Sequence, residues 1–197
     1  MMSSHTKQEM VVLCLNGLQE LSNFRFLAVT SGHRFVLSEQ SAILEHPEIQ
    51  FDIVELRNEI SMLGCFHEIG HAQTYLKILN LVKSNDDWSL ASLKSQWPLL
   101  SCYIKNPRYL PRAPSLEGNL TLQLIKATSW FWHFFPKENF NIFKERSAWA
   151  YAFYATRKHG LLSHISQKDL RNYHIRCLGS YGDSYLTSPS MWTKSEN

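Results

Sequence analysis

The spacing of apolar and polar residues divides the chain into amphipathic helices separated by irregular segments. Apolar residues recur at helical spacing in the stretches 6–22, 53–83, 119–134, 141–158 and 166–177. Residues 24–38 alternate between apolar and polar positions instead, around a Ser-Gly-His turn, and predict a β-hairpin. We therefore expect an α+β fold that is mostly helical, with a small β-hairpin or sheet beside the long helix 53–83.

The ends of these helices also carry sequence signals. The helix 53–83 is predicted to begin among acidic residues, as the helix dipole favours; these are Asp52, Glu55 and Glu59. Gly160 is predicted to end the helix 141–158. Ser166, with Asp169 three positions later, is predicted to cap the helix 166–177.

Length and composition limit the classes of protein that need consideration. A chain of 197 residues suits one domain, spanning 1–197, with a substantial core. The net charge of +3 is scattered along the chain, which makes nucleic-acid binding an unlikely function. No apolar stretch reaches membrane-spanning length, so we expect no membrane partner. The four cysteines form no C-x-x-C pair and no secretion signal is visible, which favours reduced thiols and a cytoplasmic location.

The candidate chemistry lies in the helix 53–83. His67 and His71 are four residues apart, so on a helix both imidazoles lie on one face and can reach one metal ion. Glu68 sits beside a ligand, where its carboxylate can take a proton from a zinc-bound water. This H-E-x-x-H pattern carries a metalloprotease mechanism in a helical context. Gly70 is unfavourable in a helix interior and suggests the close approach of another backbone.

A catalytic zinc ion takes three protein ligands, so the two histidines need a partner. The longer metzincin motif fails because position 77 is a lysine. The remaining candidates are Glu145, Glu138, Asp86, Asp87 and His133. We favour Glu145, because on a helix it shares a face with Ala148, Trp149 and Ala152. The two alanines on that face allow a close approach to a neighbouring helix, and Gly70 could give the matching closeness. The alternative for Glu145 is a solvated glutamate near a helix N-terminus.

Two motifs together resemble a known family. The segment His67-Glu68-Ile69-Gly70-His71-Ala72, followed by Glu145-Arg146-x-Ala148-x-x-Tyr151-Ala152, resembles gluzincin-type zinc metallopeptidases and is most similar to the small ImmA/IrrE-type proteins. The resemblance implies a zincin-like minimal metallopeptidase fold with one zinc ion at His67, His71 and Glu145. It also implies hydrolysis of peptide bonds in a protein or peptide substrate, with Glu68 as general base.

The chain departs from the family pattern in two places. The interval between His71 and Glu145 is longer than usual, so we interpret a loop and helix region of about 85–135 as an insertion. Some gluzincins place an aspartate four residues after the glutamate ligand to orient a histidine. Trp149 occupies that position here, so a partner that orients His67 or His71 is expected from elsewhere.

Two parts of the functional hypothesis stay open at this stage. A transition-state oxyanion needs a further donor, and among Tyr75, His159, His164, Tyr173 and His174 we favour Tyr173 or His174. The main alternative function is a non-catalytic zincin-like binding protein, with or without structural zinc. A DNA-binding regulator has little support because no basic cluster is present.

Overall fold

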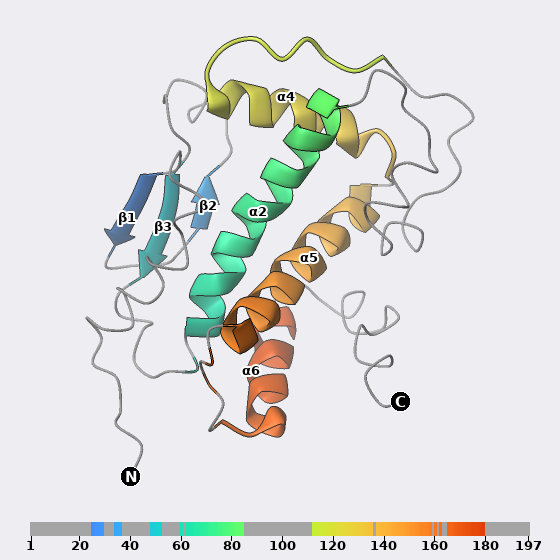
Figure 1. Cartoon of the computed structure of the whole chain (residues 1–197). Helices are drawn as coiled ribbons and strands as arrows, with labels where there is room; N and C mark the ends of the chain where they lie inside the picture. The colour runs from blue at the N-terminus through green and yellow to red at the C-terminus, as the bar shows by residue number, and fades with distance from the viewer. Residues whose placement is uncertain are drawn as a thin grey trace.

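The structure, a computed structural model, contains a bundle of helices and three short strands (Figure 1). It describes residues 25–29, 34–36, 48–52, 60, 62–84, 112–135, 137–158, 160, 162 and 165–179, and for the strands it describes the backbone only. The helices of this part are α2 (Met62–Ser84), α4 (Leu120–Trp132), α5 (Lys137–Lys158) and α6 (Gln167–Gly179). None of the helices described is both long and apolar enough to cross a membrane.

Helix α2 forms the centre of this bundle. Its first eleven residues, Met62–Ala72, are all buried, including the histidines and Glu68. A helix that is buried all round must be covered on several faces at once. In Figure 1 helix α5 runs alongside α2 in the opposite direction, and α4 crosses the C-terminal end of α2. The candidate motif therefore lies in the most enclosed part of the described structure.

Helix α4 confirms the helix predicted at 119–134 and belongs to the core. The Asn119 side chain caps its start by accepting a hydrogen bond from the backbone N–H of Leu122 at 2.9 Å. Leu124, Ala127 and Phe131 are fully buried. A region that we interpreted from the sequence as an insertion thus supplies part of the cover of α2.

The remaining helices begin and end close to the predicted residues. Helix α5 starts at Lys137, a few residues earlier than expected, and ends before Gly160, whose φ of +65° suits a residue without a Cβ. The hydroxyl of Ser166 caps α6 by accepting a hydrogen bond from the Asp169 backbone N–H at 3.1 Å. The same hydroxyl donates to the Asp169 carboxylate at 2.7 Å.

The predicted α+β fold with a β-hairpin beside the long helix is wrong. Where the structure describes side chains, the regular elements are all helices. The strands β1 (Arg25–Val29) and β2 (Arg34–Val36) do not pair with each other. The strand β3 (Glu48–Asp52) lies between them, parallel to β1 and antiparallel to β2, with Arg25 opposite Glu48 and Phe35 opposite Ile49. In a hairpin β1 and β2 would pair with each other, whereas here each of them pairs with β3, which comes later in the chain.

Two further predictions about the long helix and its surroundings need comment. Helix α2 begins at Met62 rather than at residue 53, and it has no acidic residue in its first turn; Asp52 belongs to β3. The predicted dipole interaction at its start is therefore wrong. The predicted helix 6–22 and most of the proline-rich segment 98–118 lie outside the described residues.

The closest approach of α2 to α5 occurs at Gly70. A Cβ added there would lie 2.5 Å from the carbonyl oxygen of Ala148 and 2.7 Å from its Cα. These are backbone atoms, which cannot turn aside as a side-chain end can. The absence of a side chain at Gly70 therefore sets the spacing of the two helices, as the sequence suggested.

Two glycines of α2 give a matched test of this contact. In Gly70→Ala we expect overpacking to cost about 1–3 kcal/mol, more than the gain of about 1 kcal/mol in helix propensity. In Gly64→Ala the new Cβ meets only the hydroxyl end of Tyr173, at 2.8 Å, which can shift. Urea denaturation should therefore show a loss of stability for Gly70→Ala and little change or a gain for Gly64→Ala. Equal stability of the two variants would contradict the assigned role of Gly70.

Candidate metal centre

Two histidines of α2 and a glutamate of α5, which is distant in sequence, meet between these helices. The Nε2 atoms of His67 and His71 lie 3.1 Å apart. The Glu145 carboxylate lies 3.2 Å from Nε2 of His67 through one oxygen and 3.5 Å from Nε2 of His71 through the other. All three side chains are nearly buried, with 5–11% of each exposed. Of the two candidate third ligands whose side chains are described, Glu145 and His133, Glu145 is the one placed against both histidines.

The antiparallel arrangement of the two helices explains this convergence. His67 and His71 are one turn apart on α2, and Glu145 and Trp149 are one turn apart on α5. The contact of Gly70 with the Ala148 backbone fixes the register between them. Glu145 consequently faces both histidines, and Trp149 lies against His67.

Hydrogen bonds alone cannot satisfy the three close contacts while Glu145 is ionised. Each Nε2 carries either a proton or a lone pair, and an ionised carboxylate only accepts. If both Nε2 atoms are protonated, two donors face each other; if one is not, its lone pair faces a carboxylate oxygen. Consistent with this conflict, the buried Oε2 of Glu145 accepts no hydrogen bond of normal geometry from the described residues.

A cation surrounded by the three groups would remove this conflict. Burial alone raises the pKa of Glu145, but the imidazoles of His67 and His71 hold that pKa well below its usual range, so the carboxyl is ionised at neutral pH. Tetrahedral zinc with bonds of about 2.0–2.2 Å places its ligand atoms about 3.3–3.6 Å apart. The measured separations of 3.1, 3.2 and 3.5 Å are close to these values. The residues present therefore fit a zinc ion.

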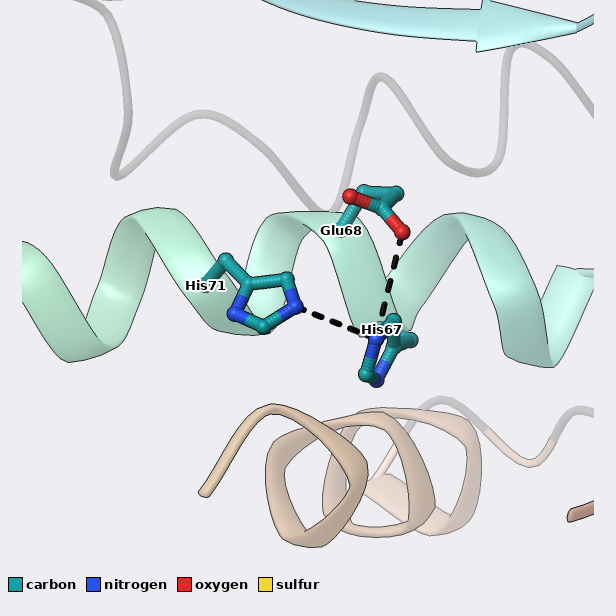
Figure 2. A group of neighbouring side chains, drawn as sticks. All are labelled: His67, Glu68 and His71. Atoms are coloured by element: carbon teal, nitrogen blue, oxygen red, sulfur yellow. Dashed lines mark hydrogen bonds and ion pairs between the residues drawn. The ribbon is translucent and has the colours of Figure 1, made fainter. Parts of the chain in front are cut away.

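Glu68 lies next to these atoms but further away. Its carboxylate is 3.9 Å from Nε2 of His67, and the dashed lines of Figure 2 show His67 linked to both His71 and Glu68. His67, Glu68 and His71 form a group that could hold a metal ion, with one donor atom from each lying within 4.8 Å of the others. Glu145 lies nearer to Nε2 of His67 than Glu68 does, at 3.2 Å against 3.9 Å.

Trp149 is a contact residue that the sequence analysis missed. Its ring lies 4.3 Å from the His67 ring between centroids, at an interplanar angle of 32°. From the sequence we placed it on the same helix face as Glu145 and noted that it replaces a possible aspartate, but we expected the partner that orients His67 or His71 from elsewhere. Its position one turn after Glu145 on the same face of α5 was the available signal. An aromatic ring, rather than a carboxylate, lies against the histidine from this position.

The predicted transition-state donors occupy different surroundings. The Tyr173 hydroxyl approaches the backbone of α2 at Gly64. The His174 ring lies 4.6 Å from that of Trp149, and burial, with Arg146 nearby, lowers its pKa to about 4. His174 is therefore neutral at neutral pH.

Tyr75, one turn after His71, interacts electrostatically with the carboxylates of the site. Its phenol is buried, and burial together with the charges of Glu145 and Glu68 raises its pKa above the usual range. Tyr75 therefore remains a protonated hydroxyl in the field of both carboxylates. It was among the donors considered from sequence, but it was not the one favoured.

The other candidate ligands do not join the site within the described part of the chain. His133 is exposed at the C-terminal cap of α4. The remaining candidate ligands lie outside the residues whose side chains are described; these are Asp86, Asp87 and Glu138. The same is true of His159 and His164, which were considered as transition-state donors.

No protein-family model matches the chain, and no curated protein or solved structure matches it either. The resemblance to gluzincin-type proteins consequently depends on the two short motifs, and the functional argument depends on the geometry of the residues that they contain.

Proposed function

We propose that the protein is a zinc-dependent peptidase that binds one zinc ion through His67, His71 and Glu145 and uses Glu68 as general base. The observation that carries this proposal is the convergence of two imidazole Nε2 atoms and an ionised carboxylate at 3.1–3.5 Å, with no protonation state in which hydrogen bonds alone satisfy all three contacts. Two imidazoles and one carboxylate are a ligand set that suits catalytic zinc.

The residues of the chain have distinct parts in the proposed reaction. A bound zinc ion supplies a Lewis acid that polarises a carbonyl and lowers the pKa of water toward about 7. Glu68, beside His67, accepts a proton from the attacking water and passes it to the leaving amine. A neutral donor is required near the developing oxyanion, and Tyr75 is a candidate alongside Tyr173 and His174.

Purified full-length protein tests this proposal through metal content and cleavage together. We expect about one zinc ion per chain, as a three-ligand catalytic site requires. Cleavage of a mixed peptide library, followed by mass spectrometry, should stop after treatment with a chelator and return with zinc. Absence of bound metal, even after zinc is supplied, would show that the proposal is wrong.

The second candidate function is a binding protein that holds zinc without catalysis. The small exposure of the three converging side chains favours it, because a substrate needs access to the metal. Bound zinc without cleavage of any peptide in the library would support this candidate. A cytoplasmic site of action is part of either proposal, as the cysteine spacing of the sequence suggests.

A further inference from the structure

The aromatic ring of Trp149 defines one side of the space around His67. The two ring centroids are 4.3 Å apart with an interplanar angle of 32°, so the indole lies largely against the face of the imidazole. The His71 ring meets His67 from another direction, at 4.6 Å and 77°. Contacts from two directions restrict rotation of the His67 ring about its side-chain bonds.

Ring packing, rather than hydrogen bonding, holds Trp149 in this place. The residue is 3% exposed, and its indole N–H has no hydrogen-bond acceptor among the described residues. Its ring also contacts His174 at 4.6 Å and Phe153 at 6.4 Å. Ring contacts with residues of α5 and α6 therefore hold the indole that packs against His67.

We propose that Trp149 is a positioning residue of the metal site, whose ring fixes the orientation in which His67 presents Nε2 to the ion. The inference rests on the proposed metal site. A histidine ligand is usually oriented by a hydrogen bond from its second ring nitrogen to a carboxylate, carbonyl or water. At this position the chain provides an uncharged aromatic face, so orientation depends on shape and ring contact and adds no negative charge.

The proposed positioning role predicts different effects on zinc affinity for two substitutions of Trp149. Trp149→Phe keeps an aromatic ring and removes an indole N–H that has no acceptor in the described part of the chain. It should retain zinc affinity within about threefold of wild type, well below the effect expected for loss of an orienting residue. Trp149→Leu keeps apolar bulk without a ring, and it should weaken zinc binding by about 10- to 100-fold, as loss of an orienting partner does.

Phe153→Leu is the matched control, because it removes another buried aromatic residue of α5 whose ring packs against Trp149 and His174. The four full-length proteins are stripped of metal and titrated with zinc in competition with a chelator of known affinity. Circular dichroism verifies that each is folded at the temperature used. The ligand-field spectrum of the Co²⁺-loaded proteins reports the ligand arrangement separately from affinity.

The proposal expects an altered Co²⁺ spectrum and weaker zinc binding in Trp149→Leu alone. Equal affinities in Trp149→Leu and wild type would overturn it and leave the metal site intact. A loss of zinc affinity in Phe153→Leu equal to that in Trp149→Leu would also overturn the proposal, because general packing of the core would then explain the effect. If Trp149→Leu does not fold, a tenfold or larger loss in folded Trp149→Phe still contradicts the role of the ring. Failure of wild type to bind zinc would overturn the proposed function itself.

Discussion

Glu68→Gln is expected to keep the metal and lose the reaction. The amide has the shape of the carboxylate but cannot accept a proton, and removal of a general base typically lowers a rate by about 10²–10⁴-fold. Zinc should remain because His67, His71 and Glu145 make the shorter contacts with one another, whereas Glu68 lies 3.9 Å from Nε2 of His67. Peptide cleavage and zinc content measured on the same preparation test both expectations.

The control for this variant is Glu117→Gln, which makes the same chemical change at an exposed site before α4. It should leave both cleavage and metal content unchanged. Full activity in Glu68→Gln would show that the general-base assignment is wrong. Loss of zinc from Glu68→Gln would instead indicate that Glu68 is a ligand, as its membership of the group with both histidines permits.

Local periodicity was sufficient to predict the meeting of α2 and α5. His67 and His71 share a face because they are four residues apart, and Glu145 shares a face with Ala148 for the same kind of reason. Gly70 added the information that a backbone approaches closely, and the Ala148 backbone is the one found there. The spacing of the motif residues within each helix, together with the small residues where the helices cross, therefore indicates which residues of α2 and α5 lie opposite each other.

Strand pairing was not predictable in this way. The segment Glu48–Asp52 alternates between polar and apolar residues, but Pro47 led us to interpret residues 39–52 as irregular. It becomes the central strand, and its parallel partner β1 lies across an intervening segment of chain. Pairing of this kind is non-local, whereas a turn such as that at residues 31–33 predicts only the pairing of its immediate neighbours.

The role of Trp149 could not be obtained from residue type alone. In the family pattern this position can hold an aspartate that orients a histidine. Its replacement by tryptophan therefore suggests that this interaction with the histidine is missing. The structure shows a ring contact at the same position instead. An aromatic residue on α5 can face either His67 or the apolar core, depending on how α5 is rotated about its own axis. The contact of Gly70 with the Ala148 backbone fixes that rotation. The same contact therefore places both the third carboxylate and the ring.

Glu145→Ala is expected to abolish tight zinc binding and, with it, the stabilisation that zinc provides. Changes outside the ligands themselves already weaken metal affinity by about 10- to 100-fold, so removal of one of three ligands should exceed that range. A ligand present at 100 times its dissociation constant stabilises the folded protein by about 2.7 kcal/mol. Wild type should therefore show a clear rise in melting temperature with added zinc, and Glu145→Ala should show little.

The metal-free proteins distinguish this effect from a simple loss of structure. Without metal, the imidazoles of His67 and His71 stabilise the ionised Glu145 carboxylate, so its removal should lower the free energy of unfolding even before zinc is added. The quantity to compare is therefore the rise in melting temperature that zinc produces in each protein relative to its own metal-free form. Glu145→Gln, which keeps the shape without the charge, should show as small a rise as Glu145→Ala. A zinc-dependent rise of wild-type size in Glu145→Ala would exclude Glu145 as the third ligand. Combined with loss of that rise in Glu68→Gln, it would assign the third position to Glu68, which forms with both histidines a group that could hold a metal ion.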